Sequence, residues 1–488
     1  MPFFLTDKQK YFETLENIVS RSAFSLSFSS PSHGIEPVSF KSFFLYVKFK
    51  SFFTFTRRKF SSIYACISAC ESTMPSVTVK LYSVLFKFFL KRKLLTLIDA
   101  AAGDPYGIVL RPDEAVAAAN PSFSEDGVAT KDLHIDPLTP LSLRIFLPDS
   151  AIVSPKSVPD LRVRVQPSRI LKKAPDGAVV YGGYLPENSG RNCRKLPVIL
   201  QFHGGGWVSG GSDTVANDVF CRRLARSCDA VVVAVGYRLA PESRYPAAFE
   251  DGVKVLNWLA KQANLAEWGR SLGNRRGGGG GDGRRMQIAD GFGASMAEPW
   301  LAAHADLSRC VVLGVSCGAN IANYVAQYSV KAGKLLDPVR VVAQVLMYPF
   351  FIGSNPTPSE IRLSSHSYLY DKSMALLAWK LFLPEAEFSL DHPAANPLNP
   401  AREVALKYVP PTLTITAEHD WMRDRAISYA EELRKVKIDA PVLDYKDAIH
   451  EFATLDALLK TPQAQACCED IAIWMKKYIS LRGNELSY

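Results

Sequence analysis

The sequence lacks the cysteine patterns of a zinc site or of a secreted disulfide framework. Its nine cysteines are an odd number, scattered from Cys66 to Cys468, with no CxxC pair and no Cys/His cluster at metal-ligand spacing. Unpaired thiols are typical of reducing compartments, whereas secreted domains use disulfides. The pattern therefore predicts a cytoplasmic protein with free thiols and no bound metal.

Long uncharged hydrophobic runs are also missing. The most apolar stretches, Ser39–Phe55 and Leu81–Ile98, are interrupted by lysine or by both lysine and arginine, and a membrane-spanning helix needs about 20 largely uncharged residues. The N-terminus does not open with a basic region, an apolar run and a small-residue cleavage site. We expect no stable membrane insertion.

Positive charge is in excess, with a net charge of +9, but most of it lies in two stretches. Residues 1–73 hold nine Lys/Arg against five Asp/Glu, and residues 270–285 hold five Arg against Asp282. The remainder of the chain is close to neutral. A nucleic-acid partner is therefore not expected, because nucleic-acid binding needs a broad basic surface.

Residues 1–73 differ in composition from the rest of the chain. They are crowded with Phe and Ser, and no period of 2 or 3.6 residues organises them. The alternatives are an organelle transit peptide, translated sequence upstream of a true start at Met74, and a disordered tail. Glu13, Glu16 and the many aromatic residues count against the transit peptide. We expect residues 1–73 to be a disordered or non-native extension.

The chain beyond residue 73 begins with a predicted helix. Apolar residues recur at the spacing of one helical stripe, which predicts a helix packed on the body of the protein, with a membrane-surface helix as the weaker alternative. The stripe consists of Val77, Leu81, Val84, Leu85 and Phe88.

The remaining pattern alternates strands and helices. Two runs alternate in polarity, and later ones are short and continuously apolar, as in strands buried on both faces. These predicted strands are Thr130–Asp136, Leu141–Leu147, Pro197–Phe202, Ala230–Val235, Cys310–Val315, Val341–Met347, Leu413–Thr416 and Val442–Tyr445. Helical runs between them, such as 216–226, 249–263 and 319–330, predict an α/β fold with a mostly parallel central sheet flanked by helices. Residues 270–285, rich in Gly and Arg, predict a flexible insertion.

The first chemical motif is Gly314-Val315-Ser316-Cys317-Gly318, which follows a predicted strand and precedes a predicted helix. Glycines on both sides permit a strained turn that presents the serine hydroxyl above the sheet. The helix N-terminus beneath it favours developing negative charge. This context predicts that Ser316 is a nucleophile.

The second motif is His203-Gly204-Gly205-Gly206-Trp207, which follows the strand at 197–202. A glycine run lets bare backbone N–H groups approach an oxyanion, because no Cβ stands in the way. An HGGG run upstream of GxSxG is the combination found in esterases.

An acid and a base follow in the chain order Ser…Asp…His. His450 is the predicted base that takes the Ser316 proton, and Asp420 is the predicted acid that orients the imidazole. Glu418 and Asp424 are rival acids, and His419 is a rival base. Asp424 is expected in a following helix as a surface or capping residue.

With Tyr237-Arg238-Leu239-Ala240-Pro241-Glu242, these motifs resemble plant carboxylesterases of the hormone-sensitive-lipase-like group within the α/β-hydrolase fold. The resemblance runs from about Pro75 to the C-terminus. It implies an oxyanion hole made by the amides of Gly204, Gly205 and Cys317. Many members carry an acid where this chain has Val315, which leaves the triad intact.

The resemblance also implies a lid, formed by an N-terminal segment (residues 74–125) and by the chain around 350–384, on a hydrolase domain of residues 126–488. The implied activity is hydrolysis of small, uncharged esters through an acyl-enzyme, with no cofactor. Alternatives on the same scaffold are a hormone-type receptor, against which the retained His450 counts, and a dehydratase. Oligomeric state is not predicted.

Overall fold

The computed structural model describes residues 77–103, 114–152, 183–186, 193–274, 297–364, 367–399 and 405–480. The prediction for residues 1–73 and most of the predicted Gly/Arg insertion lie outside these described residues. None of the described helices is long and apolar enough to cross a membrane.

Eight strands of the described chain form one sheet with the order β1-β2-β4-β3-β5-β6-β7-β8. β2 is antiparallel to both β1 and β4, and every other neighbouring pair is parallel. The α/β class with a mostly parallel sheet is therefore confirmed. The strands are β1 (Val128–His134), β2 (Ser142–Pro148), β3 (Leu196–Phe202), β4 (Val231–Gly236), β5 (Ala305–Val315), β6 (Val341–Met347), β7 (Thr412–Ala417) and β8 (Val442–Tyr445).

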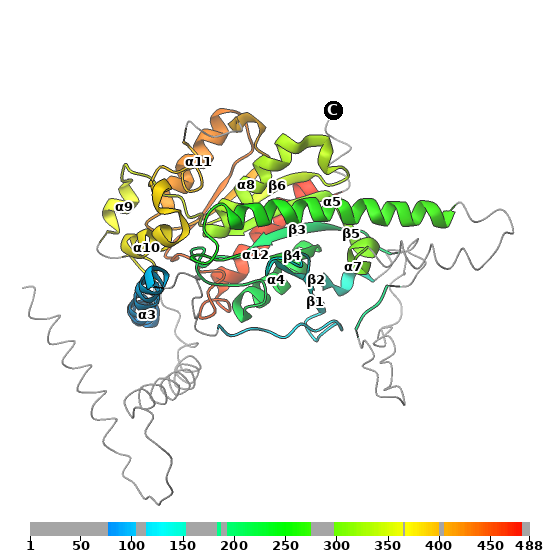
Figure 1. Ribbon diagram of the computed structural model, residues 1–488, viewed down its shortest axis with the longest axis horizontal. Helices are drawn as coiled ribbons and strands as arrows, with labels where there is room; N and C mark the ends of the chain where they lie inside the picture. Colours follow the sequence, from blue (N-terminus) through cyan, green and yellow to red (C-terminus); the bar gives the residue numbers. More distant parts are fainter. Residues whose placement is uncertain are drawn as a thin grey trace, which may run out of the picture. The chain divides into compact units, whose positions relative to one another are not determined.

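Helices cover both faces of this sheet (Figure 1). α5, α8 and α11 contribute to the hydrophobic cluster on one face, and α4 and α12 contribute to the cluster on the other. Neighbouring residues of β5 point to opposite faces, so that Val312 joins the first cluster while Val311 and Leu313 join the second. The helices are α3 (Val77–Gly103), α4 (Val215–Cys228), α5 (Ala247–Asn274), α7 (Pro299–His304), α8 (Cys317–Ala332), α9 (Pro358–Arg362), α10 (Lys372–Phe382), α11 (Arg423–Lys435) and α12 (Pro462–Ile479).

α5 is longer than the sequence pattern predicts. The helix continues through residues 264–274, so the first residues of the predicted Gly/Arg insertion, 270–274, are helical rather than looped. The extension contains strong helix formers, including leucine, alanine and glutamate, and no proline. The helix propensity of these residues explains why α5 continues to Asn274, just before the run of glycines.

α3 begins where the sequence predicts but packs through a different face. Val84 and Phe88 belong to the predicted stripe, yet their side chains are 64% and 58% exposed. Leu94 and Leu97 are buried instead, and Leu90 packs partly buried against the core. α3 packs beside α10, and the two helices lie next to each other in Figure 1. Val84 and Phe88, the two residues of the predicted stripe whose side chains are described, therefore do not form the packing face, and Leu94 and Leu97 are buried in their place.

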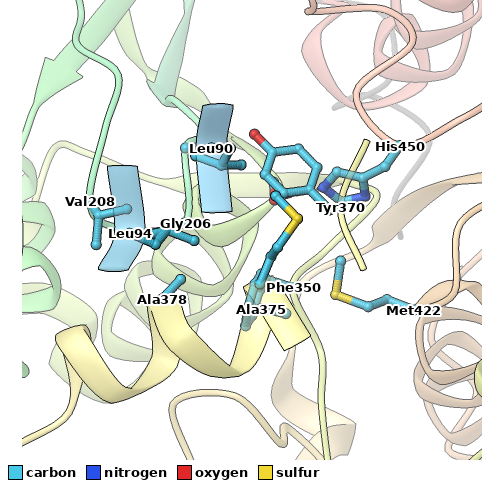
Figure 2. A pocket seen from close by; sticks show the side chains of 13 residues that line it. Leu90, Leu94, Gly206, Val208, Phe350, Tyr370, Ala375, Ala378, Met422 and His450 are labelled. Atoms are coloured by element: carbon cyan, nitrogen blue, oxygen red, sulfur yellow. Dashed lines mark hydrogen bonds between the residues drawn. The ribbon is translucent and has the colours of Figure 1, made fainter. Parts of the chain in front are cut away.

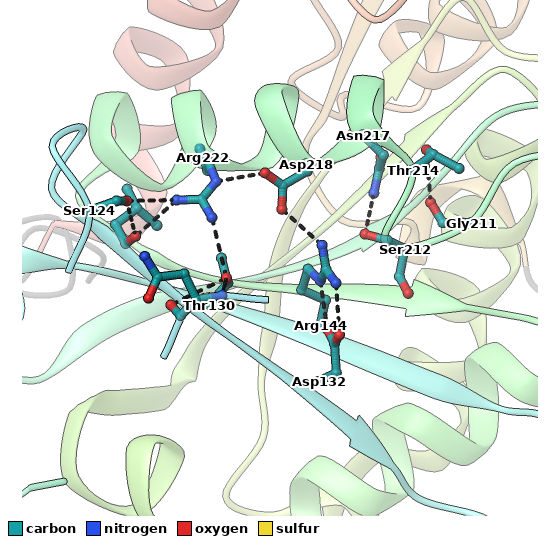
Figure 3. A network of polar contacts seen from close by, with 12 residues as sticks. Ser124, Thr130, Asp132, Arg144, Gly211, Ser212, Thr214, Asn217, Asp218 and Arg222 are labelled. Carbon is teal, nitrogen blue, oxygen red and sulfur yellow. Dashed lines mark hydrogen bonds and ion pairs between the residues drawn. The ribbon is translucent and has the colours of Figure 1, made fainter. Parts of the chain in front are cut away.

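A buried arginine ties the antiparallel edge of the sheet to α4 (Figure 3). Arg144 on β2 is 1% exposed and forms two hydrogen bonds with Asp132 of β1, at 2.6 and 2.7 Å. Its third partner is Asp218 of α4 at 3.0 Å, which also accepts from Arg222 at 2.6 Å. Arg222 donates in turn to the backbone oxygen of Val128 at 2.9 Å.

We expect Asp218→Ala to lower the free energy of unfolding by about 3–5 kcal/mol, because it removes one partner of a buried cation. Urea denaturation followed by tryptophan fluorescence measures the change. The matched control is Asp439→Ala, which breaks a largely exposed pair with Lys477 and should cost no more than about 1 kcal/mol. Equal losses in the two variants would contradict this role for Asp218.

Candidate active site

Ser316 lies in the turn between β5 and α8, with a backbone conformation that residues other than glycine rarely adopt. Its φ is 52° and its ψ is −119°, and its side chain is buried. A positive φ at a residue other than glycine indicates local backbone strain, which contacts with the surrounding structure must stabilise. They do so through backbone hydrogen bonds: the Ser316 N–H donates to Met347 at 2.9 Å, and the Ser316 carbonyl accepts from Phe350 at 3.2 Å.

The glycines on either side of Ser316 are required by close backbone approach. A Cβ on Gly314 would overlap the backbone of Gly318, and a Cβ on Gly318 would overlap the carbonyl oxygen of His203. The second contact joins the two sequence motifs directly. The turn after β5 is therefore packed against the glycine run that follows β3.

Ser316, His450 and Asp420 come from three separate segments and form one continuous hydrogen-bond chain. Ser316 Oγ lies 2.9 Å from His450 Nε2, and His450 Nδ1 lies 2.7 Å from Asp420 Oδ2. Because a carboxylate can only accept, Nδ1 donates and Nε2 is left to accept the serine proton. The Met422 N–H donates to the other carboxylate oxygen of Asp420 at 2.9 Å and fixes its orientation.

The electrostatic surroundings of His450 favour its protonated form. Complete burial is the largest single effect and lowers the pKa of the imidazole. The charge and hydrogen bond of Asp420, together with the charge of Glu451, raise it by more, so the net pKa lies above the ordinary value of 6.5. A more basic imidazole takes a proton more readily from a neighbouring hydroxyl.

The glycine run lies against the same site. Gly205 and Gly206 line the cavity beside Ser316. Gly204 is not part of the lining, but a Cβ added to it would lie 3.4 Å from the Ser316 Cβ. Gly205 has φ 106°, and a Cβ there would overlap the backbone of Ser209. Glycine is therefore required at position 205 both for its conformation and for the space around it.

His203 and Trp207, the ends of this motif, hold the run in place. The His203 Nδ1 donates to the Gly204 oxygen at 2.8 Å, and the ring stacks on Tyr237 with centroids 4.2 Å apart. Burial lowers the pKa of His203 to about 4, so the ring is neutral at pH 7. Trp207 stacks on Phe382 of α10 with centroids 4.3 Å apart. Neither side chain reaches the cavity lining.

The thiol of Cys317 is turned away from the cavity. Its Sγ accepts the Trp207 N–H at 3.2 Å and lies 3.5 Å from the Tyr237 hydroxyl. Burial raises its pKa to about 11, so the sulfur is a protonated thiol and a poor nucleophile. Its side chain instead links the serine turn to the glycine run.

The rival acids and base from the sequence lie outside the hydrogen-bond chain. Asp424 falls in the first turn of α11, as predicted, where its carboxylate accepts from the Ser359 N–H at 2.7 Å. Glu418 accepts from the Asp447 N–H at 2.9 Å. The His419 ring packs on Tyr368 with centroids 5.5 Å apart.

A small, mostly apolar cavity opens beside Ser316 and His450 (Figure 2). Its walls come from α3, the glycine run, the chain after β6, α10 and the turn after β7. Tyr370 is the other polar side chain at the wall, and its ring lies edge-on to His450 with centroids 5.2 Å apart. The apolar side chains are Leu90, Leu94, Val208, Phe350, Met374, Ala375, Ala378 and Met422.

Glu451 is a site residue to which the sequence pattern assigned no role. It follows His450 with φ 60°, and its carboxyl group is buried. Burial raises its pKa, while the neighbouring His450 and hydrogen bonds from Tyr370 and the Gly205 amide offset part of that rise. A glutamate next to a predicted catalytic histidine was visible in the sequence, but its contact with the glycine run was not.

Comparison with known proteins places this arrangement among the hydrolases. Residues 199–454 match the family model described as alpha/beta hydrolase fold, which confirms the predicted α/β-hydrolase architecture. The chain is 63% identical over 453 residues to "Probable carboxylesterase 16" of Arabidopsis thaliana and 60% identical over 462 residues to "Probable carboxylesterase 11" of the same plant. Each match covers 85% of this chain and 100% of the relative.

A solved structure shares the fold. The thermostable esterase from Pseudomonas putida superimposes with a TM-score of 0.53 at 20% sequence identity, and the match covers 85% of this chain and 100% of that esterase. At this identity the similarity concerns the arrangement of strands and helices.

Proposed function

Because this chain belongs to the alpha/beta hydrolase fold family and to the group of the plant carboxylesterases, we propose that it hydrolyses carboxylic esters through Ser316, His450 and Asp420. The observation that carries the proposal is the continuous hydrogen-bond chain from the Ser316 hydroxyl through His450 to Asp420. The nucleophile, the base and the orienting acid of a serine hydrolase need this order of contacts.

The reaction proceeds in two acyl transfers. Ser316 Oγ attacks the ester carbonyl carbon while His450 Nε2 takes the hydroxyl proton. When the tetrahedral intermediate collapses, His450 returns that proton to the leaving alcohol and the acyl group stays on Ser316. A water molecule then gives a proton to His450 and attacks the acyl carbon of the acyl-enzyme. When this second intermediate collapses, the bond to Ser316 Oγ breaks and His450 returns the proton to that oxygen, which releases the carboxylic acid and restores the serine hydroxyl. Asp420 stabilises the imidazolium in both steps.

The oxyanion of each tetrahedral intermediate is held by backbone N–H groups of the glycine run and of Cys317. Gly204, Gly205 and Cys317 are the predicted donors, and Gly206 is added because it lines the cavity with Gly205. Removing one such donor costs about 3–4 kcal/mol of transition-state stabilisation in comparable sites. Because the Gly205 amide bonds the Glu451 carboxyl group in the free protein, the oxyanion would replace Glu451 as its acceptor.

The cavity wall favours small esters without charge. Apart from Ser316, His450 and Tyr370, the side chains that line it are apolar, and an ionic group would lose its hydration there without gaining a partner. We propose that α3 and α10 act as the lid over this cavity and that the enzyme works in the cytoplasm on small-molecule esters.

Steady-state hydrolysis of p-nitrophenyl acetate, butyrate and octanoate, followed by nitrophenol release, tests the proposal. We expect turnover of the neutral esters and little turnover of a p-nitrophenyl ester whose acyl group carries a carboxylate. A protein that binds such esters but releases no nitrophenol would contradict the proposed activity and support the receptor alternative.

The pH dependence of kcat/KM follows from the raised pKa of His450. Only the neutral imidazole accepts the Ser316 proton, so activity is present above this pKa and is lost as the pH falls through it. We expect the acidic limb of the profile to have its midpoint above pH 6.5. Nitrophenol release should be read at its isosbestic wavelength. A midpoint below 6.5 would contradict the assigned role of Asp420 in raising the pKa.

A further inference from the structure

The outer face of α3 has a pattern that its packing in the fold does not explain. Val84, Phe88 and Leu95 lie at positions i, i+4 and i+11 of the helix and share one side. Their side chains are 64%, 58% and 44% exposed. Exposed apolar residues scattered singly are normal on a protein surface, but a row of them on one helix is the pattern of a contact surface.

Positive charge flanks this apolar row on both sides. At 100° per residue, Lys80 and Lys91 lie beside Val84, and Arg92 lies beyond Phe88. All three cations are exposed, and none has an ion-pair partner among the described residues. α3 carries no acidic residue before Asp99. The two other lysines of the helix point elsewhere, since Lys87 bonds Ser367 and Lys93 pairs with Glu114 at 3.1 Å.

We propose that this outer face, consisting of Lys80, Val84, Phe88, Lys91, Arg92 and Leu95, docks on the surface of an anionic lipid bilayer. A helix that lies in a membrane interface places a row of apolar side chains at the acyl boundary and cations at the level of the headgroups. The charge is complementary to anionic lipid, and each cation near such a surface is worth about 1 kcal/mol. An uncharged apolar partner would leave the three cations without a function.

The same helix borders the cavity on its other side. Leu90 and Leu94 line the cavity (Figure 2), and a helix with its side chains is about 10 Å across. A bilayer bound to the outer face would therefore lie about one helix diameter from the cavity. This position delivers apolar molecules dissolved in the bilayer to the lid of the cavity.

Co-sedimentation of the full-length protein with lipid vesicles tests the proposal without relying on catalysis. The probes are vesicles of phosphatidylcholine with 30% phosphatidylserine and vesicles of phosphatidylcholine alone. We expect at least tenfold stronger partitioning onto the anionic vesicles, decreasing as NaCl is raised. Equal partitioning onto both vesicles, or none onto either, would overturn the proposal.

Two variants locate the contact. Phe88→Ser should weaken partitioning about tenfold, because it removes an apolar side chain from the acyl boundary. Lys91→Glu with Arg92→Glu should abolish the preference for anionic lipid. The matched controls are Leu335→Ser, at an 88% exposed leucine outside α3, and Lys261→Glu on α5, and both should bind as the unaltered protein does.

Other occupants of this face give different results. If a second copy of the chain covers it, Phe88→Ser will convert a dimer to a monomer in sedimentation velocity without changing vesicle binding. If residues 1–76 cover it, Phe88→Ser will leave both measurements unchanged. Either result would overturn the proposal.

Discussion

Ser316→Ala is expected to lower kcat for p-nitrophenyl acetate by about 10⁵–10⁶-fold, the loss seen when the nucleophile of a serine hydrolase is removed. The alanine cannot form the acyl-enzyme, and His450 then has no hydroxyl from which to take a proton. A small residual rate should persist, because the backbone donors around the cavity remain in place. The stability of the protein should change little, since the substitution removes one oxygen atom.

The matched control for this substitution is Ser308→Ala. Ser308 lies on the same strand, β5, but near its other end, where its side chain is exposed and bonds Asp306. We expect unchanged kcat in this variant. Activity of Ser316→Ala within tenfold of the unaltered protein would contradict its role as nucleophile.

Asp420→Asn is expected to lower kcat by about 10⁴-fold while leaving the fold intact. The amide has the size of the carboxylate but can donate to His450 Nδ1, which then carries no proton and leaves Nε2 protonated, so that Nε2 can no longer accept from Ser316. Loss of the negative charge also removes the interaction that raises the pKa of His450. Stopped-flow or long-time assays at high enzyme concentration measure the residual rate.

The rival acids provide the controls for Asp420. Glu418→Gln and Asp424→Asn change similar groups in nearby positions whose carboxylates bond backbone N–H groups instead of a histidine. Both should retain kcat within a few fold. A 10³-fold loss in either rival, with Asp420→Asn active, would identify a different acid.

The site was predictable from the sequence because each motif follows a strand of one parallel sheet. The segments that carry His203, Ser316 and Asp420 leave β3, β5 and β7 at their carboxyl ends, and these ends meet at one edge. Continuous apolar runs marked those strands, and β6 and β8 have the predicted bounds. The sequence motifs and the strand order of the sheet therefore both locate the candidate site at this edge.

The features that could not be predicted depend on contacts between distant segments. α3 has apolar residues on two sides, so its sequence does not indicate whether Val84 or Leu94 is buried against the body of the protein. Arg144 lies in a strand whose alternation is clear, but its burial depends on Asp218, a residue of α4. Glu451 likewise acquires its contact with Gly205 only when the loop after β8 folds over the glycine run.

Labelling with a fluorophosphonate, followed by mass spectrometry of the proteolytic peptides, tests the central claim most directly, because the reagent forms a covalent bond only with an activated nucleophile. The account predicts one phosphonyl adduct, on Ser316, whose formation abolishes nitrophenol release in proportion to labelling. An adduct on Cys317 or on another serine, or full inactivation with Ser316 unmodified, would contradict it.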